Sequence, residues 1–180
     1  MRMPLIKIAV YGGSSPLPGE PAYLEAVRLG QLLGDAGVTG MTGVYIGTME
    51  AVSKGAGSKG GHVIGVTCAE IEAWRDVGAN PYVREEWKCH TLAERLEMLI
   101  RECDAAIALP GGIGTLAEVL YLWNHLVIRA LPRKPLILVS EGWKNVLETF
   151  FLQCDVYIPT SQRDFIHLAP DIDSAVSMLR

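Results

Sequence analysis

The stretch Pro110–Glu118, with the sequence PGGIGTLAE, carries the residue types and the spacing best suited to chemistry. It follows directly on the apolar run AAIAL, so the pattern predicts a buried strand, a glycine turn and the start of a helix. Gly111, Gly112 and Gly114 have no Cβ, which lets their backbone N–H groups approach an anion closely. The positive end of the helix dipole points to the same place. The loop is therefore predicted to bind a phosphate.

An acid stands about one helical turn beyond this loop. Glu118 would repel a bound phosphate, so it is unusual for simple anion binding. A carboxylate at this position is explained if part of the ligand becomes positively charged. The alternative is that Thr115 and Glu118 only form a capping box, but such a box does not require three glycines. The loop also lacks the Lys-Ser/Thr of a Walker loop and the Gly-x-Gly-x-x-Gly of a first-strand dinucleotide turn.

A second candidate lies on the helix predicted over Thr91–Glu102, where Thr91 and Glu94 complete a capping box. Taken alone, Arg95 is expected to be a solvated residue or one partner of a weak surface pair. This helix leads into the strand that ends at Pro110, however, so Arg95 and the loop form a joint signal. Arg95 and Met98 are predicted to lie together beside a core stripe formed by Leu92, Leu96, Leu99 and Cys103.

Two other turns are also rich in glycine, over residues 12–15 and 43–47. Ligands of open parallel sheets bind at the carboxyl ends of the strands, where the strand order reverses. All three turns are expected to open on that edge. The further candidates for contact with the ligand are Gly12, Gly13, Ser14, Gly43, Gly47 and Met98.

Strands and helices are predicted to alternate along the whole chain. The strands read as continuous apolar runs, which is typical of a parallel sheet covered on both faces. The expected fold is therefore α/β, a Rossmann-like doubly wound parallel sheet. The predicted strands are Leu5–Tyr11, Val38–Thr42, His62–Thr67, Cys103–Leu109, Pro135–Ser140 and Phe165–Leu168. The predicted helices are Pro21–Ala36, Thr48–Gly60, Thr91–Glu102, Gly114–Leu131, Trp143–Cys154 and Pro170–Arg180. Cys68–Lys88 is expected to be a long loop with at most one helical turn.

Length and composition exclude several classes of protein. The 180 residues suit a single domain, 1–180, with a sizeable core, and 49% hydrophobic residues indicate a globular chain. The net charge of −4, without a run of Lys or Arg, argues against a nucleic-acid partner. No apolar run approaches the ~20 residues of a membrane span, so no membrane partner is expected. The apolar start is interpreted as a first strand rather than a signal peptide.

The cysteines predict neither a metal site nor a disulfide framework. No two of them have Cys-x-x-Cys spacing, and Cys89 followed by His90 provides too few ligands for zinc. Reduced thiols in a cytoplasmic protein are expected. The four are Cys68, Cys89, Cys103 and Cys154.

These motifs together resemble the LOG ("Lonely Guy") family of cytokinin-activating enzymes and their bacterial relatives. The resemblance covers about residues 5–155, and its most specific element is Pro110–Glu118. The other matching segments are Gly12-Gly13-Ser14-Ser15, Met49-Glu50-Ala51-Val52 with Gly55-Ala56, and the pair Arg95 and Met98. At two places the sequence departs from the family pattern. Leu96 stands where a basic residue is usual, and Val44 and Ile46 stand where small residues are common.

The resemblance implies a phosphoribohydrolase, which cleaves the N-glycosidic bond of a nucleoside 5′-monophosphate to the free base and ribose 5-phosphate. It implies that Arg95 and Glu118 are the catalytic pair, and that Gly111, Gly112, Gly114 and Thr115 hold the phosphate. The chemistry agrees, because breaking this bond builds positive charge on the sugar, which a carboxylate stabilises. Arg95 either binds the phosphate or orients the carboxylate.

A binding module of the same fold is the alternative. A related group carries the molybdenum cofactor without hydrolysing it, and such a carrier would keep the glycine turns. The presence of both Arg95 and Glu118 favours the enzyme. Some relatives are described as lysine decarboxylase-like, but no lysine is placed to form a Schiff base, so no cofactor is expected.

The long helix Gly114–Leu131 predicts a homodimer, which the family resemblance also implies. One apolar stripe is assigned to the sheet, and a helix that is apolar on a second side should be buried there as well. The alternative is that the domain buries both sides in its own core. The stripe assigned to the sheet is Leu116, Leu120, Trp123, Val127 and Ala130, and the second side is Val119, Leu122, Leu126 and Ile128.

Overall fold

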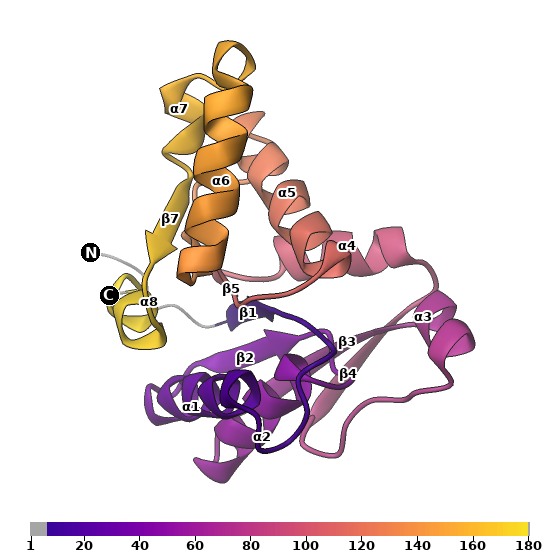
Figure 1. The fold of residues 1–180 in the computed structure, drawn as a ribbon. Helices are drawn as coiled ribbons and strands as arrows, with labels where there is room; N and C mark the ends of the chain where they lie inside the picture. The colour runs from indigo at the N-terminus through magenta and orange to yellow at the C-terminus, as the bar shows by residue number, and fades with distance from the viewer. Residues whose placement is uncertain (1–6, 180) are drawn as a thin grey trace.

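A computed structural model describes residues 7–179 of the chain. The described residues form one seven-stranded sheet in the order β4-β3-β2-β1-β5-β6-β7, with every neighbouring pair parallel (Figure 1). The strands are β1 (Lys7–Tyr11), β2 (Thr39–Thr42), β3 (Val63–Cys68), β4 (Glu85–Cys89), β5 (Ala105–Ala108), β6 (Leu136–Val139) and β7 (Ile166–Ala169). The helices are α1 (Pro21–Asp35), α2 (Thr48–Ser58), α3 (Ala69–Arg75), α4 (Leu92–Arg101), α5 (Ile113–Val127), α6 (Glu141–Gln153), α7 (Thr160–Arg163) and α8 (Ile172–Ser177), with a 3-10 turn, η1, over Asp155–Tyr157.

Both faces of the sheet are covered, as a doubly wound fold requires. Successive strand residues point to opposite faces, so Ile8 and Val10 pack with α1, α2 and α8, while Ala9 and Tyr11 pack with α4, α5 and α6. The two helix layers lie on opposite sides of the strands in Figure 1. The fold class predicted from the sequence is confirmed.

The strand order reverses between β1 and β5, which pair side by side in the middle of the sheet. The chain leaves the two strands in opposite directions, so their loops open a crevice at the carboxyl edge. The loops are also tied together, because Gly13 N donates a hydrogen bond of 3.2 Å to Pro110 O. Two of the predicted glycine turns therefore meet at this switch point.

Several sequence predictions need correction. The predicted loop Cys68–Lys88, which allowed one helical turn, contains the seven-residue helix α3 and most of β4. Strand β4 pairs with β3 at the edge of the sheet. Leu92, assigned to a core stripe, is exposed, whereas Arg95 on the same helix is buried. The capping box at the start of α4 is confirmed. Leu5 and Ile6 of the predicted first strand, and Arg180 of the predicted last helix, lie outside the described residues.

The two sides of the long helix were misassigned in part. Leu116 and Val127, assigned to the sheet, do pack against the core, and Ile128 of the second side is exposed. Val119, Leu122 and Leu126, predicted to face outward, are buried in the core. Leu120, predicted to face the sheet, is instead exposed. Trp123 is buried, but against α6 and α7 rather than under the sheet. The helix also ends at Val127, before the predicted Leu131.

Among the described residues, no helix combines the length and the apolar character that crossing a membrane would take.

Candidate active site

A cavity of about 490 Å³ opens at the switch point, a size that suits a small-molecule ligand. The β1–α1 loop, the first turns of α5, the inner side of α4 and the short helix α3 form its walls. Eight residues predicted from the sequence line it: Gly12, Gly13, Ser14, Arg95, Gly112, Gly114, Thr115 and Glu118. The structure thus brings most of the predicted site together in one place.

Arg95 and Glu118 form an ion pair at the inner wall of this cavity. Arg95 Nη1 donates to Glu118 Oε1 at 3.3 Å, and Arg95 Nε donates to Val66 O at 3.0 Å. The two residues are only 5% and 6% exposed. The guanidinium also lies 5.9 Å from the ring centre of Tyr45. Arg95 is therefore held on the carboxylate, in the arrangement of a residue that orients it.

Burial dominates the titration of the acid. It raises the pKa of Glu118 from its ordinary 4.5 to about 7, although Arg95 acts in the opposite direction. A carboxyl group with a pKa near neutrality, beside a charged partner in a cavity, is typical of a functional site. Such a group can hold either protonation state at physiological pH, which suits catalysis that depends on its charge.

The β5–α5 loop leaves its backbone open to the cavity. A Cβ placed on Gly112 or Gly114 would meet no atom within 4 Å, so packing does not explain these two glycines. Thr115 is buried in the first turn of α5. The first N–H groups of a helix have no intrahelical acceptor, and here they surround open space. This arrangement suits an anion.

The capping-box alternative for this loop is wrong. The N-cap of α5 is Gly112, which makes no side-chain capping bond within the described structure. Thr115 is therefore the third residue of the helix rather than its cap. Glu118, one turn later, contacts Arg95 instead of the backbone at the start of α5.

Other predicted residues shape the cavity without lining it. A Cβ on Gly111 would lie 2.1 Å from Thr115 Oγ1, and one on Gly43 would lie 1.9 Å from Arg95 Nη2. Gly43 therefore leaves the space that the guanidinium occupies. Gly47 has a φ of 74°, which favours glycine, and its carbonyl accepts from Ala51 N in the first turn of α2.

Met98 does not line the cavity either. Its side chain packs against the hydrophobic core beneath α4. Val44, which departs from the family pattern, is also buried in the core, and its Cγ1 occupies the space beside Gly65. The bulk of Val44 is thus directed away from the cavity.

One whole wall of the cavity was not predicted from the sequence. Tyr45, Ile71, Trp74, Arg75 and Leu92 line it in addition to the predicted residues. Three of them lie on α3, within the segment predicted to be a loop. The only signal in the sequence was the concentration of aromatic residues between 74 and 87, which had no assigned role.

The composition of the site bears on metals and cofactors. The described residues include no cluster of three or more His, Cys, Asp or Glu side chains that could hold a metal ion. The four cysteines are free thiols. Lysine is missing from the described residues that line the cavity, so the lining offers no amine for a Schiff base.

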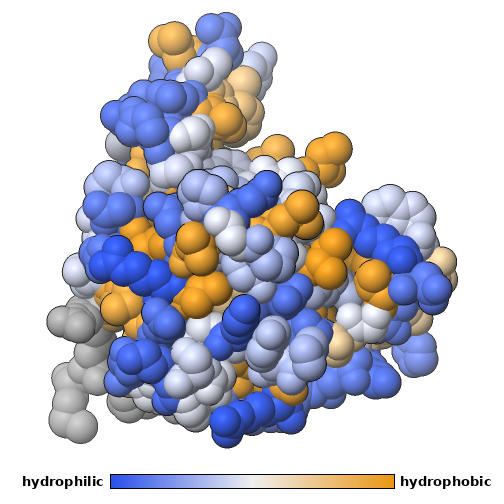
Figure 2. Space-filling model, turned by 60° about the horizontal axis from the view of Figure 1, so that its bottom comes forward, coloured by the Kyte–Doolittle hydropathy of each residue, from blue (hydrophilic) through white to orange (hydrophobic). Residues whose placement is uncertain are grey.

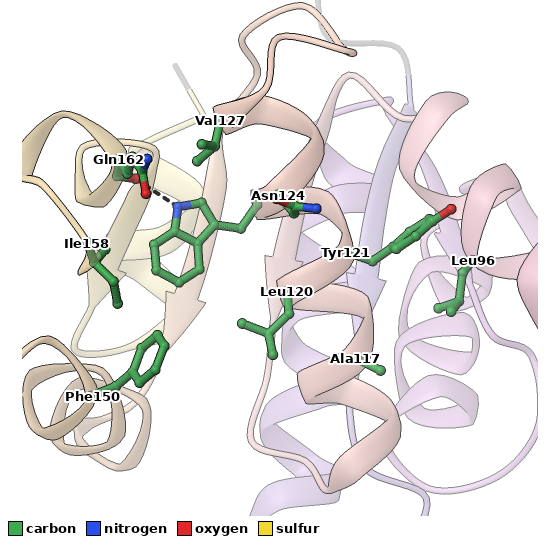
Figure 3. A pocket seen from close by; sticks show the side chains of 10 residues that line it. Leu96, Ala117, Leu120, Tyr121, Asn124, Val127, Phe150, Ile158 and Gln162 are labelled. Atoms are coloured by element: carbon green, nitrogen blue, oxygen red, sulfur yellow. Dashed lines mark hydrogen bonds between the residues drawn. The ribbon is translucent and has the colours of Figure 1, made fainter. Parts of the chain in front are cut away.

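A second cavity, of about 520 Å³, lies on the outer side of α5. Figure 3 shows Leu120, Phe150 and Ile158 pointing into it from α5, α6 and the segment after η1. Trp123 forms part of its wall and donates from Nε1 to Gln162 O at 2.7 Å. We call this cavity the α5–α6 groove. It shares Leu96 and Ala117 with the first cavity, so the two cavities are neighbours.

Comparison with known proteins identifies relatives of this chain. A family model described as "Possible lysine decarboxylase" matches residues 49–179. A probable cytokinin riboside 5′-monophosphate phosphoribohydrolase of Oryza sativa is 34% identical over 96% of this chain and 77% of its own length. A pyrimidine/purine nucleotide 5′-monophosphate nucleosidase of Escherichia coli is also 34% identical, over 79% of this chain but only 32% of its own length.

Among solved structures, a molybdenum cofactor binding protein from Rippkaea orientalis has the same fold. Its TM-score is 0.75 at 23% identity, over 99% of this chain and 97% of that chain. This likeness extends to the fold alone. The family match and the identity to the plant enzyme go further: the chain belongs to the LOG family.

Proposed function

We propose that this protein hydrolyses the N-glycosidic bond of a nucleoside 5′-monophosphate, releasing the base and ribose 5-phosphate. The observation that carries the proposal is the buried Arg95–Glu118 pair, placed in one cavity with the open glycine loop that begins α5. The names of the plant and bacterial relatives support it. An AMP-like nucleotide is the proposed substrate.

In this proposal the phosphate binds at the start of α5, on the N–H groups around Gly112, Gly114 and Thr115. The sugar then lies towards Glu118, one turn further along the helix. As the C1′–N bond breaks, its electron pair leaves with the base and positive charge develops on the ribose. Ionised Glu118 stabilises that charge, and a water oxygen forms the new bond to C1′. The water provides the proton that the base takes up.

Arg95 orients Glu118 in this scheme. Its guanidinium already contacts the carboxylate, and the carbonyl of Val66 fixes it from behind. It also favours the ionised form of Glu118 against the effect of burial. We therefore prefer orientation of the carboxylate to direct phosphate binding as the role of Arg95.

Release of adenine from AMP by the purified protein tests the proposal. Glu118→Gln should lower kcat by ~100-fold or more, because an isosteric amide removes the charge that stabilises the transition state. Adenosine should react far more slowly than AMP, because it lacks the phosphate that the α5 loop binds. Circular dichroism and thermal unfolding of the variant control for folding. Equal rates for AMP and adenosine, or full activity of Glu118→Gln, would contradict the proposed site.

Carriage of the molybdenum cofactor is the alternative function for this fold. The similarity to such proteins lies below 25% identity and extends to the fold alone. The buried Arg95–Glu118 pair favours hydrolysis. A carboxylate beside a bound phosphate repels it, so in a protein that only carries the ligand this carboxylate would weaken binding. The AMP assay separates the two functions.

We further propose that the protein is a homodimer, with the α5–α6 groove at the contact between subunits. The groove is largely apolar, and Leu120 and Phe150 on its walls are 39% and 40% exposed. Apolar and aromatic side chains of this kind are common in homodimer interfaces. A cytoplasmic location is also proposed, because the cysteines are free thiols and three of the four are buried.

A further inference from the structure

One wall of the active-site cavity has no role in the proposed reaction. The glycine loop accounts for the phosphate, and the Arg95–Glu118 pair accounts for the reacting bond. The remaining wall consists of Ile71, Trp74, Arg75 and Leu92, from α3 and the start of α4. The part of a nucleotide that is still without a contact is its base.

Trp74 is the most unusual residue of this wall. It lines the cavity yet is 74% exposed, and it belongs to neither hydrophobic core cluster. The guanidinium of Arg75 lies over its ring at 4.6 Å from the centroid, so one face of the indole is occupied. A large aromatic surface that contributes nothing to the core and borders a cavity is a candidate for ligand contact.

Helix α3, which carries Trp74, is tied to α4 although α3 itself is exposed. None of the seven residues of α3 is buried, so core packing does not hold this helix. Instead Glu70 Oε2 accepts a hydrogen bond of 2.8 Å from Leu92 N, at the start of α4. A carboxylate at a helix N-terminus is a favourable contact. It fastens α3 to the helix that carries Arg95.

In Figure 2 the lobe at the right, where Figure 1 places α3, projects from the body of the molecule. Hydrophobic and polar residues alternate over the surface between this lobe and the rest. The α3 wall is open to solvent, because none of the residues of α3 is buried and Leu92 is also exposed.

We propose that Trp74 is the base-binding residue of this site, and that the nucleobase stacks on its indole, with Ile71 and Leu92 as apolar neighbours. This inference rests on the proposed function, because it assigns the base of that same nucleotide. Stacking is tolerant of base identity, since every base has a π-face. The site therefore distinguishes nucleotides from base-free sugar phosphates, and it favours purines over pyrimidines through their larger stacking surface.

The kinetic test compares Trp74→Ala and Trp74→Phe with the unmodified protein. Loss of stacking should raise the KM for AMP about 5- to 150-fold in Trp74→Ala, with kcat changed much less. Phenylalanine keeps an aromatic face, so Trp74→Phe should recover most of the affinity. Ribose 5-phosphate has no base, so its inhibition constant should stay within about twofold in all three proteins. Since Trp74 is exposed, neither change should disturb folding.

A binding test avoids turnover by using the Glu118→Gln background. AMP should quench the tryptophan fluorescence of this protein, and Trp74→Phe should abolish the quenching. Trp87→Phe is the matched control, because Trp87 lies on β4 outside the lining of the cavity and donates to Glu85. The quenching should persist in that variant.

The outcomes separate this inference from the proposed function. If the protein releases adenine from AMP and Trp74→Ala leaves KM unchanged, the function stands and the role of Trp74 is wrong. An equal loss of affinity for AMP and ribose 5-phosphate would also overturn it. If AMP binds and quenches through Trp74 but no base is released, the hydrolase proposal fails and the stacking site stands. Failure of AMP to bind at all would refute both.

Discussion

The ion pair between Arg95 and Glu118 is not explained by a contribution to the stability of the fold. A buried ion pair loses so much hydration that an apolar pair of the same volume is often no less stable. Here the penalty is visible in the carboxyl group itself, because burial raises the pKa of Glu118 to about 7 in spite of Arg95. The pair is better explained by its place in the cavity, where its charge can act on a ligand.

The first prediction at the scale of residues concerns pH. The folded state holds the proton of Glu118 up to about pH 7, whereas an ordinary carboxyl group loses it near 4.5. The folded state therefore binds more protons in this window, and its stability should fall as pH rises from about 4.5 to 7. Urea unfolding across this pH range should show this decrease in the free energy of unfolding for the unmodified protein. Glu118→Gln should lack the decrease.

The same titration should appear in catalysis. Because the ionised carboxylate stabilises the developing charge, kcat should rise with pH and level off above about 7. The residual activity of Glu118→Gln should lack this limb of the profile. A pH profile that is identical for the two proteins would contradict the assignment of Glu118.

Tyr11 provides a second prediction about single residues. Its side chain is fully buried at the end of β1, and its hydroxyl has no hydrogen-bond partner among residues 7–179. An unsatisfied buried polar group costs about 1–3 kcal/mol. Tyr11→Phe should therefore raise the free energy of unfolding, by about 1 kcal/mol, as measured by urea denaturation. A clear loss of stability would show that the hydroxyl has a partner, such as bound water.

The residues of the site were more predictable than their surroundings. The glycines of the β5–α5 loop and Glu118 lie close together in the sequence, so their spacing alone indicates a phosphate-binding loop followed by an acid. The burial of Arg95 was not predictable from its helix, because the space for its guanidinium comes from Gly43, 52 positions earlier. Only the tertiary structure places the two together.

The β5–α5 loop leads to a prediction for which the neighbouring glycine is the control. A Cβ on Gly112 meets no atom within 4 Å, whereas a Cβ on Gly111 would collide with Thr115 Oγ1 and lie 3.0 Å from Gly13 N. Gly112→Ala should therefore keep the stability of the protein and weaken phosphate binding, measured as KM for AMP. Gly111→Ala should lower the melting temperature as well. Unchanged kinetics in Gly112→Ala would argue against phosphate at this loop.

Elements were predictable where the pattern was strong. The apolar runs of β1, β5 and β6 lie between two helix layers, so their sequences identify them. Strand β4 was not predicted because most side chains of its sequence, EEWKC, are exposed, so it shows no apolar run. Its extended conformation is stabilised by pairing with β3 at the edge of the sheet. The two sides of α5 were misassigned in part because both are apolar, and periodicity alone does not say which side faces the sheet.

The active-site cavity and the α5–α6 groove are neighbours in the folded protein. Leu96 and Ala117 line both of them, one from α4 and one from α5. A subunit seated in the groove would thus lie beside the cavity that holds Arg95 and Glu118. This proximity connects the proposed dimer to catalysis, because a partner in the groove would cover Ala117, an exposed residue that also lines the active-site cavity.

The last prediction tests this connection. Leu120 is 39% exposed and lines the groove, so Leu120→Glu would place a charge in the proposed interface, at a high cost in desolvation. Sedimentation velocity at micromolar concentration should show a dimer for the unmodified protein and a monomer for this variant, with lower activity on AMP. Leu24→Glu is the matched control, because Leu24 is an exposed leucine on α1, in the opposite helix layer, and should leave both properties unchanged. A protein that is monomeric and fully active without any substitution would exclude the groove as part of the working unit.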